Sequence, residues 1–410
     1  MVADVLISGG GLIGQTCALA LAAHGLTSII VDSADPVTAL APDFDGRASA
    51  IASASWKMMH AIGLADALEP FGSPIERIWV SDGLKPGELD FSPAPDDGYL
   101  GIMVENRRMR FALADAVRAS DAITLLAPVA TTTIDRTPGG VTVTLDDGRV
   151  LTAPVLAVCE GRRSSTRDAA GIPLAHWSYG HTAMIGAIAH EVPHERVAYE
   201  IFYPDGPFAL LPLQDLTVPS PGGHRHRCAF VWSTSDRDAP ALLKLGPRGF
   251  RAELLRKMGG ILGDVEEIAP RGSYALGYQR AASVVADRLV LVGDSAHGIH
   301  PIAGQGFNLG LRDIATLVEV LVEGSRLGLD LGDRQLLARY GRWRAVDILS
   351  VGLATDGLAR LFGIPGNAAS AIRRFGLARV QNSGMLKEFF MNQARGESGD
   401  LPKLLTGAAV

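Results

Sequence analysis

Cysteine is scarce in this chain, and its few thiols are poorly placed for cross-links or metal ligation. The 410 residues contain three cysteines, Cys17, Cys159 and Cys228, which lie far apart and show no metal-ligand spacing. Small secreted domains that depend on disulfides need a denser and usually even set. We therefore expect a protein of a reducing compartment, without a disulfide scaffold.

Long apolar runs and an excess of positive charge are also missing. No stretch of 18 or more apolar residues occurs, so the sequence predicts no transmembrane helix. The first residues lead directly into a glycine loop, so we expect no signal peptide. A net charge of −6 and a pI near 5.9 argue against nucleic acid as the main partner. The length is typical of two or three domains, or of one nucleotide-binding domain with insertions.

Near its N-terminus the chain has a glycine-rich turn between a predicted strand and a predicted helix. This βαβ opening has a strand at residues 3–7, three glycines spaced G-x-G-x-x-G (Gly9, Gly11 and Gly14) and a helix at residues 16–24. A second strand at residues 28–31 follows and ends at an acid, Asp32. The first glycine permits a tight turn, the second lets a pyrophosphate approach the helix, and the third lets helix and strand pack closely. Asp32 then binds ribose hydroxyls. The pattern predicts a dinucleotide site and leaves FAD and NAD open.

A second glycine-rich loop lies in the last third of the chain, between a predicted strand at 288–292 and a predicted helix at about 306–323. Gly304 and Gly306 let the backbone approach a flat ligand, and the helix directs unpaired N–H groups towards it. Asp294 is placed to accept hydrogen bonds from a polyol such as a ribityl chain. The loop suits the pyrimidine edge of a flavin, which gains negative charge on reduction. The alternative is an ordinary Gly/Pro-rich loop before a helix.

The rest of the chain alternates between short strands and amphipathic helices. We expect helices at 53–62, 104–119, 240–259, 334–362, 368–380 and 385–392. We expect short strands at 75–99, a hairpin at 130–135 and 141–145, a buried strand at 154–158, antiparallel strands over 172–233 and a strand at 273–278. The tail from Arg395 is predicted to be frayed.

Together these motifs resemble the FAD-dependent single-component aromatic monooxygenases, and within them the ubiquinone-biosynthesis hydroxylases. The resemblance rests on the N-terminal fingerprint, on Glu160-Gly161 with Ser164 and Arg167, and on Gly293-Asp294. Two further stretches are similar to the ubiquinone subfamily, HPIAGQGFNLGLR at 300–312 and DGPFALLP at 205–212. The family usually has Asp where this chain has Glu160, which leaves the effect on cofactor and reductant open.

The resemblance implies an α/β fold, with an FAD-binding Rossmann-like domain, an antiparallel-sheet α+β substrate insert and a helical C-terminal region. The expected FAD-binding domain is discontinuous and comprises residues 1–73, 99–171 and 272–350. The expected substrate domain comprises residues 74–98 and 172–271, and the C-terminal helical region residues 351–410.

The implied reaction uses FAD, NAD(P)H as reductant and molecular oxygen. A flavin hydroperoxide hydroxylates the aromatic ring of a polyprenyl phenol or benzoquinol in ubiquinone biosynthesis, and the cofactor carries most of this chemistry. The protein must orient the ring and exclude water. Ring position, chain length, NADH versus NADPH and oligomeric state stay open.

The resemblance and the motifs together assign residue roles. Cofactor contacts are expected from Gly9, Gly11, Leu12, Ile13, Gly14, Asp32, Ser33, Arg47, Arg107, Val129, Glu160, Gly161, Arg167, Gly293, Asp294, Pro301, Gly304, Gly306, Phe307 and Asn308. Residues beside the reacting atoms are expected to be His300, Pro301, Gly304, Gln305 and Gly306. No metal is implied, and His224 and His226 are expected in a solvated loop. No substrate base is identified. His181, Tyr203 and Gln214 are cavity candidates, and the alternative for each is an ordinary core or surface position.

Two other activities stay open at this point. One is hydroxylation of a small soluble aromatic acid or phenol, and the other is a non-catalytic protein that binds prenylated partners on the same fold. We expect a cytoplasmic location. Because a prenylated substrate lives in a bilayer, peripheral contact with the inner membrane or with a biosynthetic complex is left open. Residues 372–380, which mix arginines with apolar groups, are the candidate membrane-facing segment.

Overall fold

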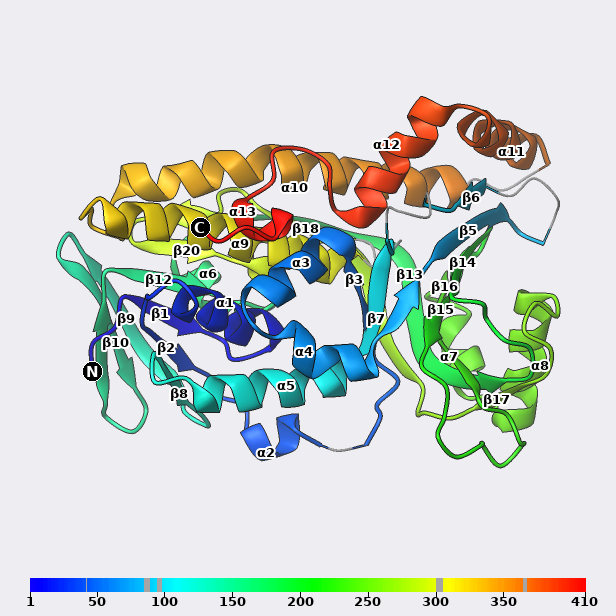
Figure 1. Ribbon diagram of the computed structural model, residues 1–410, viewed down its shortest axis with the longest axis horizontal. Coiled ribbons are helices and arrows are strands. Elements are labelled where there is room, and N and C mark those ends of the chain that lie inside the picture. The colour runs from blue at the N-terminus through cyan, green and yellow to red at the C-terminus, as the bar shows by residue number, and fades with distance from the viewer. Residues whose placement is uncertain (42, 85–88, 94–97, 300–304, 364–366) are drawn as a thin grey trace.

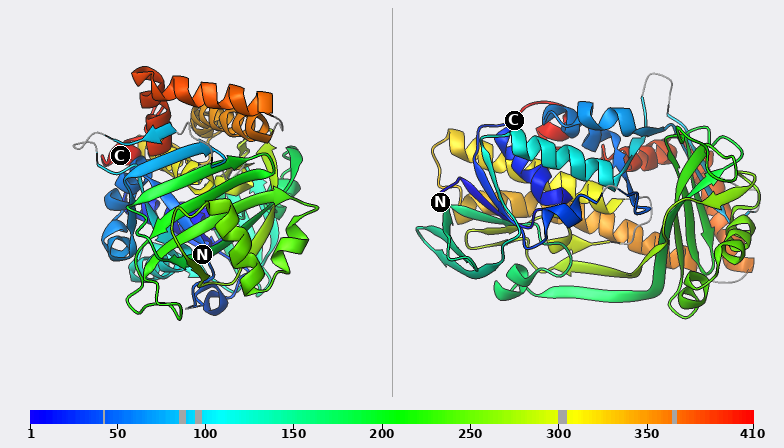
Figure 2. Two further views of the ribbon diagram at one scale, coloured as in Figure 1. Left: turned by 90° about the vertical axis from the view of Figure 1, so that its right-hand side faces the viewer. Right: turned by 90° about the horizontal axis from the view of Figure 1, so that it is seen from below.

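The computed structural model describes residues 1–41, 43–84, 89–93, 98–299, 305–363 and 367–410. A parallel sheet with its helices forms one part of the molecule, and a large antiparallel sheet stands at the opposite end (Figure 1). Two further views show the long helices α9 (Gln305–Arg326) and α10 (Arg334–Gly363) along one side (Figure 2). This mixed α/β architecture confirms the predicted fold class.

The first sheet has the order β19-β20-β12-β1-β2-β8, and all its pairings are parallel except that of β19 with β20. Its strands are β1 (Val5–Ser8), β2 (Ser28–Val31), β8 (Ile123–Leu126), β12 (Val155–Val158), β19 (Val285–Ala286) and β20 (Leu289–Leu291). The short apolar runs that predicted β1, β2, β12 and β20 are buried on both faces, as expected for a covered parallel sheet. Strands β8 and β19 at the two edges were not predicted and are less buried.

Different elements cover the two faces of this sheet. Val5 and Ile7 pack with α1 (Leu12–Ala22), α5 (Asn106–Ala119) and α9. Leu6, between them in sequence, packs on the other face against the three-stranded sheet β11-β10-β9. That sheet consists of β9 (Thr131–Thr137), β10 (Gly140–Leu145) and β11 (Val150–Ala153). The predicted hairpin therefore gains a third strand, and it forms the cover of the sheet's second face.

The large sheet has the order β21-β18-β13-β16-β15-β14-β5-β6, with β17 also paired to β13. Its strands are β5 (Arg77–Asp82), β6 (Leu89–Phe91), β13 (Leu174–His190), β14 (Val197–Tyr203), β15 (Gly206–Leu213), β16 (His226–Ser235), β17 (Val265–Glu267), β18 (Gly272–Ala281) and β21 (His297–Gly298). Helix α8 (Pro247–Met258) packs on one face, next to α7 (Ala239–Leu243). We propose the substrate domain over 74–98 and 172–271; β18, just beyond it, pairs with β13 in the same sheet.

A small sheet, β3-β7-β4, lies between the two large ones. It consists of β3 (Ala48–Ala52), β7 (Gly101–Glu105) and β4 (Ser73–Ile75). Because β7 takes residues 101–105, the helix expected from 104 begins at Asn106. The remaining short elements are α2 (Pro36–Ala39), α3 (Ser53–Ala61), α4 (Ala65–Leu68), η1 (Glu69–Phe71), α6 (Ser165–Ala169) and η3 (Gly293–Ser295).

The C-terminal region adds α11 (Asn367–Gln381), α12 (Gly384–Arg395) and α13 (Lys403–Thr406). The prediction of a frayed tail was wrong. Leu404 and Leu405 are fully buried in the core shared with α9, and the Lys403 backbone N–H donates to Glu319 Oε2 at 2.7 Å. This packing could not be predicted, because two adjacent leucines in a short segment do not reveal what they pack against.

Candidate active site

A cavity of about 970 Å³ lies at one edge of the parallel sheet. Its wall combines three loops that are distant in sequence: Gly9 and Gly11 after β1, Glu160 after β12, and Gly293 after β20. These strands are neighbours in the sheet, and their carboxyl ends meet at the same edge, where open α/β sheets bind ligands. The two glycine loops singled out in the sequence thus line one cavity.

The three fingerprint glycines serve different purposes. Gly9 has φ +101°, and a Cβ there would lie 2.6 Å from Cys159 O. A Cβ on Gly14 would lie 1.9 Å from Gly9 O, so strand and helix could not keep their packing. A Cβ on Gly11 would meet nothing within 4 Å. The turn therefore needs Gly9 and Gly14 for itself, whereas Gly11 leaves open space in the cavity, as a bound pyrophosphate requires.

The end of β2 supplies the expected acid. Asp32 accepts hydrogen bonds from the Gly10 N–H at 2.5 Å and the Ala34 N–H at 2.7 Å, and it lines the cavity together with Ser33 and Val129. The Val129 N–H donates to Asp32 O at 2.9 Å. These contacts hold the carboxylate at the strand end, where it is placed to receive ribose hydroxyls.

Glu160, which stands where the family usually has Asp, is hydrogen-bonded to three neighbouring residues. Its carboxylate accepts from Ser8 Oγ at 2.6 Å, Ser164 Oγ at 2.7 Å and the Thr166 N–H at 3.0 Å, and it also accepts from the Thr166 hydroxyl. The extra methylene lets one carboxylate connect β1, the loop after β12 and the first turn of α6. Glu160 therefore orders the cavity wall itself.

Arg167 lies behind the cavity and is absent from its lining. The buried guanidinium donates from Nη1 to Arg162 O at 3.1 Å and to Ser295 O at 3.3 Å. It thereby ties the loop after β12 to the turn that carries Gly293 and Asp294. The structure thus gives Arg167 a supporting position in place of the direct cofactor contact that we expected.

Ile13 connects the N-terminal turn to the second loop. A Cβ added to Gly293 would lie 3.3 Å from Ile13 Cγ1, and one added to Gly310 would lie 2.6 Å from Ile13 Cδ1. Leu12 and Ile13 both line the smaller cavity. The start of α9 and the Gly293 turn can thus approach α1 closely because glycine stands at both contacts.

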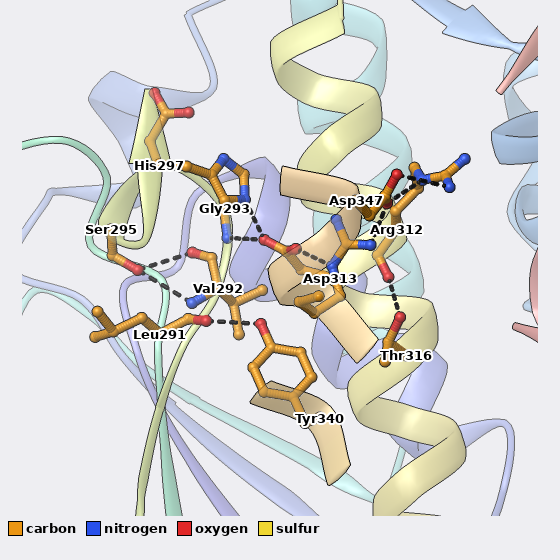
Figure 3. A network of polar contacts seen from close by, with 12 residues as sticks. Leu291, Val292, Gly293, Ser295, His297, Arg312, Asp313, Thr316, Tyr340 and Asp347 are labelled. Carbon is orange, nitrogen blue, oxygen red and sulfur yellow. Dashed lines mark hydrogen bonds and ion pairs between the residues drawn. The ribbon is translucent and has the colours of Figure 1, made fainter. Parts of the chain in front are cut away.

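A buried polar network holds the Gly293 turn against helix α9 (Figure 3). Asp313 on α9 accepts from the Gly293 N–H at 2.8 Å, and it is within hydrogen-bond distance of His297 Nε2 at 2.6 Å. Its other oxygen accepts from Arg344 Nε at 2.6 Å. Burial by itself would raise the pKa of Asp313, but the charges of His297 and Arg344 outweigh it and hold that pKa below its usual range. This network was not predicted from the sequence, although Asp313 directly follows the HPIAGQGFNLGLR stretch.

Two outer contacts extend the network to α10. Tyr340 donates its hydroxyl to Leu291 O at 2.7 Å, and Arg312 pairs with Asp347 at 2.6 Å between Nε and Oδ2. Arg344 also pairs with Asp347. Helix α10 therefore holds both β20 and α9 in place beside the glycine loop.

A second cavity, of about 1370 Å³, adjoins the first. The two share Ser49, Asn106, Arg163, Asp294, Gly306 and Phe307 in their linings. From there the larger cavity extends along the large sheet, lined by Ala198, Phe202, Ala209 and Leu211 and, from the C-terminal helices, by Leu377, Phe389 and Phe390. An extended cofactor can thus lie in the first cavity and present its far end to a mostly apolar second one.

Asp294 stands at the junction of the two cavities. Its side chain is exposed and opens into both cavities. Desolvation by the cavity walls raises the pKa of Asp294, and the positive charges of His297 and Arg162 oppose the shift. Its backbone oxygen accepts from Gln279 Nε2 at 3.2 Å, which fixes the turn while leaving the carboxyl directed at the cavities.

Two expected flavin contacts have additional partners in the protein. Asn308 donates from Nδ2 to Ala50 O at 2.8 Å and accepts from the Ala52 N–H at 2.8 Å, so its amide joins α9 to β3. Arg107 pairs with Glu105 at 2.5 Å and does not line either cavity, whereas its neighbour Asn106, which we had not singled out, lines both.

The remaining predicted site residues lie partly inside and partly outside the described ranges. Arg47 lines the larger cavity and is exposed. His300, Pro301 and Gly304 lie outside the described residues. Gln305 begins α9, and Gly306, with no atom within 4 Å of an added Cβ, lines both cavities.

None of the three candidates from the strand region lines either cavity, so each takes the alternative core or surface position. His181 Nδ1 contacts Tyr179 O at 2.8 Å, Tyr203 donates to Lys257 O on the α8 side, and Gln214 donates to Gly72 O at 3.0 Å. Within the described ranges, no group of three or more His, Cys, Asp and Glu side chains is arranged to hold a metal ion.

Comparison with known proteins agrees with this geometry. Residues 2–346 match the family described as "FAD binding domain". The "Ubiquinone hydroxylase UbiL" of Rhodospirillum rubrum is 43% identical over 409 residues, which cover 99% of this chain and 93% of that protein. The chain belongs to the FAD-dependent monooxygenases. The "3-demethoxyubiquinol 3-hydroxylase" of Escherichia coli is 30% identical, covering 96% of this monooxygenase and 98% of its own chain.

Solved structures agree on the fold. The p-nitrophenol 4-monooxygenase PnpA from Pseudomonas putida DLL-E4 has a TM-score of 0.78 with 16% identity, covering 98% of this monooxygenase and all of that chain (100%). FAD is the cofactor, as the family match shows, and NAD(P)H is the reductant typical of this class of enzymes. The cavities fit FAD, because Gly11 and Gly306 leave space where a side chain would intrude and because the smaller cavity reaches from Asp32 to Phe307.

Proposed function

We propose that this monooxygenase hydroxylates the aromatic ring of a polyprenyl phenol or benzoquinol in ubiquinone biosynthesis. The observation that carries the proposal is the larger cavity. Its volume of about 1370 Å³ exceeds the roughly 300–1,000 Å³ of common small-molecule sites, and apolar side chains dominate its sheet wall. The 43% identity to a protein named ubiquinone hydroxylase supports the same substrate class.

The smaller cavity is proposed to bind FAD, and the larger one to bind the aromatic substrate. Gly11, Asp32 and Asp294 are proposed to hold the pyrophosphate, ribose and ribityl parts of FAD. The N-terminus of α9, with the N–H groups of Phe307 and Asn308, is proposed to face the flavin pyrimidine edge, because the helix dipole is positive there. When bound and reduced, FAD would activate O₂ for the transfer of one oxygen atom to the aromatic ring. The apolar wall then keeps water away from the ring. The roles of His300, Pro301, Gly304 and Gln305 remain sequence predictions.

A small aromatic acid is the rival substrate. Such a substrate needs a cation or several donors on the sheet wall to bind its carboxylate. In the described part of the larger cavity, the cations are Arg47, Arg162, Arg163 and Arg373, and none lies on β14, β15 or β16. Arg373 is ion-paired to Asp82, with 3.0 Å between Nε and Oδ1. This distribution favours the prenylated substrate.

The C-terminal helices are the proposed entrance for the prenyl chain. Phe375 on α11 and Met385 and Phe389 on α12 are 66%, 82% and 55% exposed. Phe389 also lines the larger cavity. The guanidinium of Arg379 lies 5.6 Å from the centre of the Phe375 ring, which places a cation within this apolar surface. We propose that this surface contacts an anionic bilayer peripherally. In the described part of the chain, no helix has the length and hydropathy needed to cross a membrane.

The proposal is tested with purified, FAD-loaded protein. We expect slow NAD(P)H oxidation that a prenylated phenol stimulates, with the hydroxylated product identified by mass spectrometry. Stimulation by hydroxybenzoates but not by prenylated phenols would favour the rival. Protein that cannot be loaded with FAD would contradict the enzyme assignment. In the host, loss of the protein should accumulate the unhydroxylated quinone precursor.

A further inference from the structure

One side chain on the sheet wall differs in chemistry from all its neighbours. Along β14, Tyr199 and Ile201 pack into the core beside α8, so Ala198, Glu200 and Phe202 point towards the other face. That face is the wall of the larger cavity, and Glu200 is part of its lining. The alternation in VAYEIFY, which predicted the strand, thus directs a carboxyl group into an apolar cavity.

The strand register shows how isolated this carboxyl is. Glu200 is flanked by Val80 on β5 and Ala209 on β15. The same row continues through Val231 and Ile185, and both line the cavity. No hydrogen bond or ion pair of the Glu200 side chain occurs within the described ranges, and burial raises its pKa to about 7.

The charged and titratable groups nearby are occupied or belong to the cofactor end. Asp82, which lies opposite Phe202 in the register, is ion-paired to Arg373 on α11. Across the cavity the lining includes Arg47, Tyr274 and Asp294, of which Asp294 stands at the junction with the FAD cavity. Among the described lining residues, Glu200 and Asp294 are the carboxyl groups.

Glu200 is half-buried, so its carboxylate has lost part of its water without gaining a donor from the protein, which is unfavourable. The penalty is relieved when a ligand brings a donor to the same place. A prenyl chain has no donor, so the polar end of the substrate must meet Glu200. The hydroxyl group of a phenolic ring is such a donor.

We propose that Glu200 is a catalytic residue that binds and activates the substrate's ring hydroxyl; this proposal rests on the proposed function. The carboxylate accepts a hydrogen bond from the phenol O–H and takes its proton as the ring is attacked. The O–H electron pair stays on the phenol oxygen and enriches the ring. The oxygen comes from O₂, and NAD(P)H supplies the two electrons through FAD. As the O–O bond breaks, one oxygen atom with its hydrogen joins the ring carbon, and the other takes up the proton that this carbon loses and leaves as water. Glu200 then returns its proton to the phenol oxygen.

Binding tests this proposal without turnover. FAD-loaded protein at pH 8 is titrated with 2-geranylphenol and with its O-methyl ether, which lacks the donor, and the flavin absorbance is followed. We expect the wild-type protein to prefer the phenol by roughly tenfold to a hundredfold, the range for a hydrogen bond to a charged group. Glu200→Gln should bring this ratio close to one. Glu253→Gln, which removes a carboxylate on α8 outside both cavities, is the matched control and should keep the wild-type ratio.

Turnover supplies a second readout. We expect kcat/KM for hydroxylation to fall below about pH 7 in the wild type, and we expect Glu200→Gln to lose that pH dependence and about 10²- to 10⁴-fold of its rate. Glu200→Asp should retain the pH dependence with a lower rate. Glu200→Leu should raise Tm, because it removes an isolated charge, and should lose the preference for the phenol.

The outcomes separate the two proposals. An unchanged phenol-to-ether ratio in an FAD-loaded Glu200→Gln protein would overturn the role of Glu200, even if prenylated phenols are hydroxylated. Failure of the wild type to hydroxylate any prenylated phenol would overturn the proposed function. In that case the binding ratio still decides whether Glu200 recognises a ring hydroxyl.

Discussion

Replacing Asp313 by asparagine removes a charge that three buried groups share. In the native chain its two oxygens receive Gly293 N–H, His297 Nε2 and Arg344 Nε, all within 2.8 Å. Asparagine has a single acceptor oxygen, and its amide N–H₂ must face at least one of these nitrogen groups. The substitution therefore leaves a donor facing a donor in the layer beneath the Gly293 turn.

The expected loss of folding stability follows from the burial of this ion pair. The Asp313 side chain is 0% exposed and that of Arg344 2%, and removing one partner of such a buried pair costs about 3–5 kcal/mol. Arg344 keeps its contact with Asp347, so we expect a value near the lower end, about 3 kcal/mol. Because the Gly293 N–H loses its acceptor, we also expect FAD binding to weaken by at least about tenfold, which corresponds to roughly 1.4 kcal/mol.

Thermal unfolding of apoprotein and fluorescence titration with FAD measure the two effects separately. Glu319→Gln is the matched control, since Glu319 lies on the same helix and is nearly buried, but its carboxylate holds the Lys403 N–H of the tail. This control should lower Tm while leaving FAD affinity unchanged. An Asp313→Asn protein with wild-type Tm and wild-type FAD affinity would refute the view that the network supports the cofactor loop.

Three further predictions address other parts of the molecule. Gly11→Ala should leave the Tm of the apoprotein unchanged but weaken FAD binding, whereas Gly14→Ala, whose Cβ would lie 1.9 Å from Gly9 O, should lower that Tm itself; equal effects in differential scanning fluorimetry would contradict the assigned roles. Burial lowers the pKa of His190 from 6.5 to about 4, so the unfolded chain binds a proton that the folded chain excludes. The free energy of unfolding therefore has its full value with respect to His190 above pH 6.5 and falls by up to about 3 kcal/mol as the pH decreases towards 4. His190→Phe should flatten the dependence of Tm on pH in this window. Phe389→Ser should reduce co-sedimentation with anionic vesicles; undiminished binding would argue against the α11–α12 surface.

The sequence was sufficient wherever a function depends on a few adjacent residues. The fingerprint around Gly11 could be assigned because a turn that admits a phosphate needs glycine at fixed spacings. The period of two in β14 and the apolar runs of the parallel sheet likewise record burial directly. Membership of the FAD-dependent monooxygenases and the mixed α/β fold followed from the order of these local motifs.

Only the tertiary structure decided which distant groups act together. Asp313 lies in a readable motif, but its partner Arg344 comes from a different helix, and nothing in local spacing connects the two. Gln214 lies beyond the end of β15, and Tyr203 on β14 faces away from the cavity because alternate strand residues point to opposite sides of a sheet. Glu200 was overlooked for the same reason: an acid in an alternating strand normally faces solvent, and only the packing of α8 on one face and the cavity on the other shows that this one does not. Sequence encodes local geometry and burial period, whereas the meeting of side chains from separate elements depends on how those elements pack.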